Sequence, residues 1–244
     1  FPQGTTTVPA IRLAEKLASI LPGNLERSWL VSGGSEANET AVKIARSYHS
    51  RVGENGRYKV ISRRGSYHGA TAGVLWMGSG VDRVDYEPSP TGMLYVPQPN
   101  SYRCEFGSRT EEECAERCAE AVERMILFHG PETIAAFIGE PISASSLATV
   151  PGEIYWPMLR EICDRYGVLL IADEVITGFG RTGKMFASEH WDLVPDLMTV
   201  AKGITSSYVP MAAAIAKRDV ADVFSGSENI FRQALTSGGH PVSA

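Results

Sequence analysis

The stretch LMTVAKGIT, residues 197–205, decides how the rest of the chain is interpreted. Residues 197–201 have the length and apolar character of a buried strand, and Lys202 follows them directly. Because removing an ammonium from water is costly, a desolvated lysine tends to lose its proton, and a neutral amine can attack a carbonyl. The simpler interpretation is a strand-end lysine whose ammonium reaches solvent.

Composition limits the possible functions. The 244 residues are 43% hydrophobic and 21% charged, which is typical of one large globular domain or two small ones. The net charge of −5 gives no general electrostatic case for nucleic acid. No apolar run approaches the roughly 20 residues that span a bilayer, and we expect no signal peptide. We therefore expect a cytoplasmic protein without nucleic-acid or membrane partners.

The four cysteines are too few for a disulfide scaffold and favour a reduced compartment. Cys114 and Cys118 are four residues apart and would share a helix face. A metal site would need two further ligands at suitable spacing, and the sequence shows none. We expect these two cysteines to be small buried helix residues, and we expect no metal site.

Apolar strands alternate with helical segments, which indicates an α/β fold. We expect strands at residues 29–31, 58–61, 134–139, 168–172, 197–201 and 211–216, and helices at 9–21, 36–51, 110–128 and 155–166, with a small-residue helix after residue 69 and a Pro- and Gly-rich connection at 78–108. Strands that are apolar along their whole length predict a mostly parallel sheet with helices on both faces.

In such sheets, ligands bind at the carboxyl ends of the strands. Polar and glycine-rich residues collect there, at residues 32–35, residues 67–69, Glu140, Asp173 and Lys202. Residues 33–35, Gly-Gly-Ser, join a strand to a helix start, where backbone N–H groups and the helix dipole favour an anion. This is not a Walker A loop, because no Gly-Lys-Ser/Thr follows.

Asp173 ends an apolar strand, and a buried carboxylate needs a cation or several donors. Its partner is either an arginine such as Arg181 or a protonated heterocycle nitrogen, and Tyr67 offers an aromatic face. A hydrolase triad of Ser35, His68 and Asp173 is arithmetically possible, but the chain lacks a G-x-S-x-G elbow.

Residues 178–183, GFGRTG, match the dinucleotide pattern G-x-G-x-x-G and raise an NAD(P)-dependent oxidoreductase as a rival. The match lacks the strand-to-helix context that the pattern requires, so we do not assign it a cofactor. One ligand would use the other groups together, namely pyridoxal 5′-phosphate (PLP). Its phosphate suits Gly34 and Ser35, its ring Tyr67, its pyridinium nitrogen Asp173, and its aldehyde Lys202.

Six motifs run in one order along nearly the whole chain: SGGSEANE (32–39), YHGAT (67–71), EPI (140–142), DEVITGFGRTG (173–183), AKGITSSYVP (201–210) and TSGGHP (236–241). With them the chain resembles the class III (omega) aminotransferases. The resemblance implies the fold-type I architecture of PLP-dependent enzymes, with a mostly parallel seven-stranded sheet and helices on both faces.

The resemblance also implies roles for single residues. Lys202 would hold PLP as a Schiff base and move protons, and Asp173 would pair with the pyridine nitrogen. Tyr67 and Val175 would cover the two faces of the ring, while Gly34 and Ser35 would hold the phosphate.

Three further residues have less direct roles in the resemblance. Glu140 would lie near the cofactor and support Asp173 or the Schiff-base region, and His68 would stand behind the residues that touch the cofactor. Thr236 would reach the phosphate in the neighbouring subunit, which implies a homodimer.

Some features depart from the family pattern. Ile176 stands where many members have glutamine, residues 142–147 (ISASSL) replace the usual glycines, and the aromatic residue that commonly follows Thr236 is missing. The sequence starts without Met and stops abruptly, so we expect residues 1–244 to be a large PLP-binding domain. The N-terminal segment and the C-terminal small domain of the family would lie outside it.

The sequence thus predicts a PLP-dependent aminotransferase. It would move an amino group from an amine or omega-amino acid to a 2-oxo acid, with pyruvate as the expected acceptor, by a ping-pong mechanism through Lys202. Two alternatives stay open: another class III reaction, such as a glutamate semialdehyde aminomutase or an amino-acid racemase, and an inactive cofactor-domain fragment.

Overall fold

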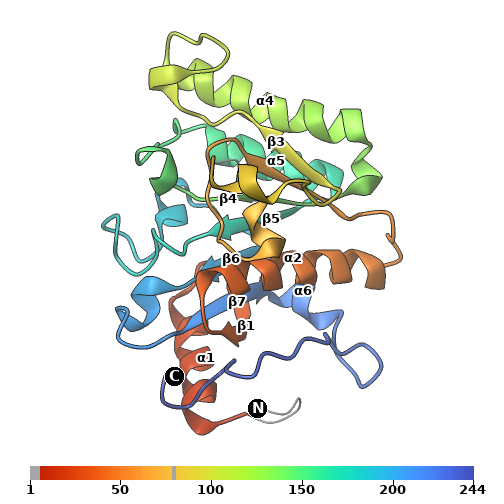
Figure 1. Ribbon diagram of the computed structural model, residues 1–244, viewed down its shortest axis with the longest axis vertical. Helices are drawn as coiled ribbons and strands as arrows, with labels where there is room; N and C mark the ends of the chain where they lie inside the picture. Colours follow the sequence, from red (N-terminus) through yellow and green to blue (C-terminus); the bar gives the residue numbers. More distant parts are fainter. Residues whose placement is uncertain (1–5, 79–80) are drawn as a thin grey trace.

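The computed structural model describes residues 6–78 and 81–244, so residues 1–5 of the expected domain lie outside it. The described residues form a seven-stranded sheet with the strand order β1-β7-β6-β5-β4-β2-β3 (Figure 1). The strands are β1 (Leu25–Val31), β2 (Lys59–Arg63), β3 (Met93–Val96), β4 (Ile134–Gly139), β5 (Leu169–Asp173), β6 (Leu197–Val200) and β7 (Ala212–Lys217).

Six α-helices of the described chain surround the sheet. They are α1 (Val8–Ile20), α2 (Gly34–Arg51), α3 (Ala72–Leu75), α4 (Glu111–His129), α5 (Tyr155–Tyr166) and α6 (Arg218–Asp222). Six short 3₁₀ helices lie between them: η1 (Val81–Tyr86), η2 (Ser101–Arg103), η3 (Pro131–Thr133), η4 (Ala144–Ser146), η5 (Ala187–Trp191) and η6 (Lys202–Thr205). Within the described residues, no helix is both long and apolar enough to cross a membrane.

The sheet is mostly parallel, as predicted. Strands β3, β2, β4, β5 and β6 pair in parallel, and β7 runs antiparallel to both β6 and β1. The residues of β4, β5 and β6 are all buried, because helices cover both faces of the sheet. Helices α2 and α3 contribute to the core on one face, and α1, α4 and α5 to the cores on the other.

The predicted central strands and long helices agree with the structure to within a few residues, whereas the edges of the sheet were harder to predict. Strand β3 lies inside the segment expected to be a Pro- and Gly-rich connection, and β1 begins at Leu25 rather than Trp29. Both are edge strands in which most residues are not fully buried, so they lack the continuous apolar character that marks a central strand.

Candidate active site

A cavity of about 160 Å³ lies at the carboxyl ends of β4, β5 and β6, beside the first turn of α2. Its lining includes every residue that the resemblance places at the cofactor except Thr236: Gly34, Ser35, Tyr67, His68, Glu140, Asp173, Val175 and Lys202. Glu140, Asp173 and Lys202, which are 33 and 29 positions apart in the sequence, therefore meet, because parallel strands present their carboxyl ends at one edge of the sheet.

Asp173 is the buried end of β5, and its carboxylate is held by three donors. Oδ2 accepts hydrogen bonds from Asn38 Nδ2 at 2.8 Å and from His68 Nδ1 at 2.7 Å, and Oδ1 accepts one from the backbone N–H of Val175 at 3.0 Å. These groups, rather than an arginine, provide the compensation that a buried carboxylate needs. The carboxylate is consequently fixed in direction toward the cavity that it lines.

Asn38 is a site residue that the sequence interpretation missed. It is buried on α2, donates a second hydrogen bond to the main-chain oxygen of His68 at 2.8 Å, and accepts one from Thr199 Oγ1 at 2.6 Å. A usable signal was present, because Asn38 lies three residues after Ser35 and so shares its helix face. A polar amide between the buried Ala37 and Ala41 indicates that this face of the helix makes specific hydrogen bonds as well as apolar contacts.

His68 lies between two carboxylates. Its side chain is fully buried, and Nε2, which makes no hydrogen bond, lies 3.8 Å from Glu140 Oε2. Burial alone would lower the pKa of this imidazole, but the charges of Glu140 and Asp173 outweigh it and raise the pKa above the usual value. The imidazole is therefore held toward its protonated form next to Asp173.

Glu140 follows β4 and is nearly fully buried beside a second residue missed in the sequence, Arg63. The Arg63 guanidinium donates to the main-chain oxygen of Glu140 and to its Oε2, the latter at 3.2 Å. Burial would raise the pKa of Glu140, but the charges of His68 and Arg63 lower it below the usual value. This carboxylate thus stays ionised in the core because two cations face it.

The second oxygen of Glu140 positions the aromatic residue of the cavity. Oε1 accepts from the backbone N–H of Tyr67 at 3.2 Å and from the hydroxyls of Ser143 and Ser145 at 3.1 and 3.2 Å. Glu140 thus contacts His68 and Tyr67 and reaches Asp173 only through His68. The Tyr67 side chain is 48% exposed, which leaves its ring available to a ligand.

The first turn of α2 and the loop at Gly69 are packed closely together. A Cβ on Gly34 would lie 2.9 Å from Val175 Cγ1, and a Cβ on Gly69 would lie 2.5 Å from Ser35 Oγ. Gly69 also has φ +135°, which side chains with a Cβ rarely adopt. Ser35 Oγ accepts a hydrogen bond from the backbone N–H of Ala70 at 3.1 Å. The two glycines thus keep open the space above the helix N-terminus.

Lys202 follows β6 at a sharp turn of the backbone. The strand before it is buried, as is Ala201, but the Lys202 side chain is exposed. Lys202 begins η6 rather than extending β6, and its φ of +45° places the backbone in the left-handed region. This turn puts the lysine at the open side of the cavity that it lines, in agreement with the simpler of the two sequence interpretations, in which the lysine side chain reaches solvent. Ser206 and Ser207, just after η6, are also left-handed, with φ of +51° and +62°.

The geometry argues against a hydrolase triad. His68 does contact Asp173, but its other ring nitrogen, Nε2, makes no hydrogen bond and lies near Glu140. The hydroxyl of Ser35 accepts instead from the backbone of Ala70. A serine nucleophile needs a hydrogen bond to its base, and these two side chains do not make one.

The glycine-rich residues 178–183 form turns and do not start a helix. The buried carboxylate of Glu174 anchors this segment by accepting hydrogen bonds from Thr177 Oγ1 and from the backbone N–H groups of Ala187 and Ser188. The strand–turn–helix unit of a dinucleotide site is therefore missing here, in agreement with the sequence interpretation.

Three other features noted in the sequence lie at or beyond the edge of the cavity. Ile176, where the resemblance led us to expect glutamine, lines the cavity. Leu147 and Ala148, at the end of the loop that follows Glu140, are left-handed with φ of +57° and +55°. Thr236 is exposed in a turn and is not among the lining residues. Its expected role in a second subunit stays a prediction.

A larger hollow of about 790 Å³ lies between α1, β1 and residues 230–239. Its lining is mainly apolar, from side chains such as Ile11, Phe231 and Leu235, and it contains none of the residues predicted to bind the cofactor. We place the candidate active site in the smaller cavity, where a lysine amine, a fixed carboxylate and a helix N-terminus converge.

Comparisons with known proteins assign the chain to a family. A model described as Aminotransferase class-III matches residues 2–244. The chain is 45% identical, over 247 residues, to a probable aminotransferase, Rv3329, of Mycobacterium tuberculosis, covering 99% of this chain and 52% of that protein. It is 39% identical, over 244 residues, to the putrescine–pyruvate aminotransferase of Pseudomonas aeruginosa, covering 98% and 53%.

A solved structure supports the same family assignment. The amine transaminase from an uncultivated Pseudomonas species, in its PLP-bound form, superposes with a TM-score of 0.94 at 36% identity, covering 100% of this chain and 56% of that one. The chain spans about half the length of the curated relatives that it matches. From its sequence and from its fold alike, the chain belongs to the class III aminotransferase family.

Proposed function

We propose that the protein is a PLP-dependent aminotransferase, and that this chain forms its large cofactor-binding domain. The observation that carries the proposal is that Lys202 lines the same cavity as Asp173, whose carboxylate Asn38 and His68 hold in place. Family membership and a PLP-bound structural neighbour imply the cofactor. The proposal includes an N-terminal segment and a small C-terminal domain outside this chain.

The residues of the cavity fit PLP in chemistry. The N-terminal turn of α2, with Ser35, suits a phosphate, and the space that Gly34 and Gly69 leave open allows close approach of an anion. Tyr67 and Val175 offer an aromatic and an aliphatic side chain for the faces of a flat ring. The carboxylate of Asp173 accepts three hydrogen bonds and keeps acceptor capacity for a protonated ring nitrogen.

When bound, PLP supplies a carbonyl that receives the amino group and a ring that withdraws electrons from the substrate. In the proposal, Asp173 keeps a proton on the ring nitrogen, and the protonated imidazole of His68 keeps Asp173 oriented. Lys202 Nζ binds the cofactor and then moves a proton at the substrate carbon that carries the amino group. Ser35 holds the phosphate, so that the reacting carbon stays within reach of Lys202.

The substrates in this proposal are an amine or omega-amino acid as donor and a 2-oxo acid as acceptor, in a ping-pong reaction. The name of the Pseudomonas aeruginosa relative supports pyruvate as the acceptor. We also propose a homodimer in which Thr236 reaches the cofactor phosphate of the other subunit. A cytoplasmic location agrees with the four free cysteines.

Trapping of the cofactor tests the site directly. PLP added to the protein should give a visible absorbance band, and borohydride reduction followed by peptide mass spectrometry should locate the phosphopyridoxyl group on Lys202. The band should disappear in Lys202→Ala and persist in Lys184→Ala, a matched change at an exposed lysine. Labelling at another lysine, or an unchanged band in Lys202→Ala, would remove the basis of the proposal.

Product analysis tests the reaction. A panel of amines and omega-amino acids, assayed with pyruvate on a version extended to the full length of the relatives, should give alanine. Product formed without any 2-oxo acid would point instead to an aminomutase or a racemase. Assaying residues 1–244 beside the extended version tests the inactive-fragment alternative, because only the extended version should then turn over.

A further inference from the structure

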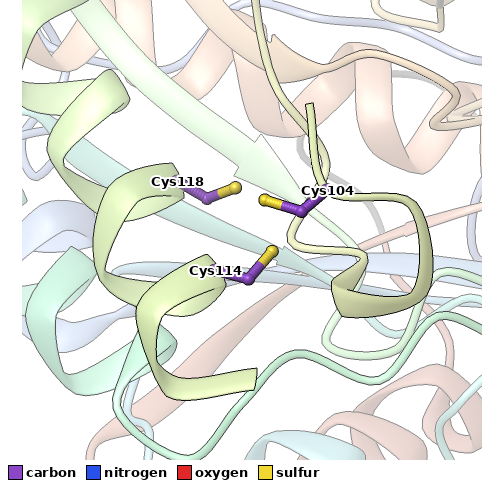
Figure 2. A group of neighbouring side chains, drawn as sticks. All are labelled: Cys104, Cys114 and Cys118. Carbon is purple, nitrogen blue, oxygen red and sulfur yellow. The ribbon is translucent and has the colours of Figure 1, made fainter. Parts of the chain in front are cut away.

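Three cysteine thiols gather in one place outside the candidate active site. The sulfur atoms of Cys104, Cys114 and Cys118 all lie within 4.8 Å of one another, and none is in a disulfide. Figure 2 shows Cys114 and Cys118 on one helix and Cys104 on the facing loop, with the three sulfurs turned toward one another. The sequence had suggested only the helical pair, because nothing in the spacing of Cys104 places it beside α4.

The two helical cysteines are firmly positioned. They lie four residues apart on α4, so they share a face, and both are buried against the core under α4 and α5. The helix start that precedes them is fixed by Thr110, whose Oγ1 accepts a hydrogen bond from the backbone N–H of Glu113 at 3.1 Å. Their sulfurs are consequently held at a constant spacing by a regular helix.

The loop that carries Cys104 is tied to the same helix. Arg117 of α4 donates to the main-chain oxygen of Phe106 at 3.3 Å, and the backbone N–H of Gly107 closes a turn onto the oxygen of Cys104 at 3.0 Å. Gly107 has φ +66°, the left-handed conformation that this turn uses. Cys104 itself is only partly buried, so the group has one side that solvent can reach.

We propose that these three cysteines form a binding site for one thiophilic metal ion, Zn²⁺ or Cu(I). Metal–sulfur bonds of about 2.3 Å in a trigonal arrangement require sulfurs roughly 4 Å apart. The observed spacing needs only small side-chain rotations to reach this value. Sulfur ligands select soft cations. Within the described residues, no histidine or carboxylate joins the three sulfurs at this distance, so the protein ligands are thiolates alone.

The solvent-facing side at Cys104 provides the entry path, and for Zn²⁺ it leaves a fourth position for water. Binding converts three thiols into three thiolates and releases three protons to solvent, with no change of oxidation state. The bound ion would fasten the loop at residues 101–108 to α4. This proposal does not depend on the aminotransferase reaction, because none of the three cysteines lines the candidate active site.

Metal titration of the PLP-loaded protein tests the site. The reduced and chelator-treated protein is titrated with Zn²⁺ against a chromophoric chelator, with Cu(I) against a Cu(I)-specific chelator, and with Co²⁺, whose thiolate charge-transfer band reports sulfur ligation. One equivalent of Zn²⁺ or Cu(I) should bind, and Co²⁺ should give the band. Cys104→Ser and Cys118→Ala should each weaken binding by about tenfold or more and abolish the band.

Cys163→Ala is the matched control, because Cys163 is another buried free cysteine and is not part of the group. This variant should bind like the parent. In the parent, Zn²⁺ should also slow the alkylation of Cys104, a readout that needs no variant to fold. Any of three results would overturn the proposal. They are unchanged metal affinity in Cys104→Ser, alkylation of Cys104 that Zn²⁺ does not slow, and failure of the parent to bind one equivalent of metal. Rapid formation of a disulfide within the group, without metal binding, would assign the cysteines to redox chemistry instead.

Discussion

Replacing Asn38 by leucine removes the amide that organises the candidate active site. The Asn38 side chain makes three buried hydrogen bonds, to Asp173 Oδ2 at 2.8 Å, to the main-chain oxygen of His68 at 2.8 Å and from Thr199 Oγ1 at 2.6 Å. The bond to the carboxylate is charge-assisted and contributes about 1.5–3 kcal/mol, and each neutral bond contributes about 0.5–1.5 kcal/mol. Leucine has the same branched shape and the same number of side-chain heavy atoms, so no cavity is created.

The expected loss is about 3–5 kcal/mol of the free energy of unfolding, because three polar partners stay buried without Asn38. For a chain of this size, that corresponds to a fall in Tm of roughly 10 °C. Urea unfolding followed by circular dichroism measures the loss. Thr199→Val is the milder companion variant, expected to cost about 1 kcal/mol, because it removes only one of the three bonds.

Asn55→Leu is the matched control, since Asn55 is exposed and accepts a hydrogen bond from Ser50 at the surface. Its cost should stay within about 0.5 kcal/mol. PLP should also bind more weakly to Asn38→Leu, because Asp173 would lose a donor that sets its direction. A loss below about 1 kcal/mol in Asn38→Leu, with unchanged PLP affinity, would refute the idea that this amide orients Asp173.

Three further outcomes are expected. The raised pKa of His68 means that its stabilisation is complete below the unfolded-state value of about 6.5 and is lost as pH rises through the raised pKa. The lowered pKa of Glu140 means that its stabilisation is present above about 4.3 and is lost as pH falls through the lowered pKa. Unfolding free energies across pH should therefore be highest between these limits, and a flat profile would contradict both assignments. Gly69→Ala should lower the free energy of unfolding by more than about 2 kcal/mol and weaken PLP binding, because a Cβ there would lie 2.5 Å from Ser35 Oγ. Calorimetry measures the loss of stability, and a PLP titration measures the loss of affinity. A variant with unchanged stability and affinity would refute the close packing at Gly69. Ala148→Gly should raise stability by about 0.5–1 kcal/mol by relieving a left-handed backbone at φ +55°, and a lower Tm would show that this backbone is not strained.

The central sheet was predictable because its strands are buried on both faces. Strands β4, β5 and β6 are buried throughout, and they are apolar except for Thr199 and the terminal Asp173. The charged residue at or just after the end of each strand falls at the carboxyl edge of a parallel sheet. Glu140, Asp173 and Lys202 could therefore be expected to lie together from strand order alone. The edge strand β3 lacked this signal, since one side of an edge strand has no neighbour to pack against.

The partners of these residues could not be predicted in the same way. Arg63 reaches Glu140 because β2 lies beside β4, and Thr199 reaches Asn38 because α2 packs against β6. Such contacts depend on which strands are neighbours and on the rotation of a helix, which a single sequence does not specify. The same holds for Cys104, whose approach to α4 follows from a turn closed by Gly107.

The left-handed backbone at Lys202 limits how far this protein can be stabilised by engineering. At φ +45° a residue with a Cβ costs about 1 kcal/mol relative to glycine, so the backbone favours glycine at the position where the proposed function requires a lysine. Consensus or computational redesign that rewards relaxed backbone geometry will tend to select against the lysine. The adjoining left-handed serines, Ser206 and Ser207, carry the same conformational cost without an amine. Optimisation of this turn should start with them.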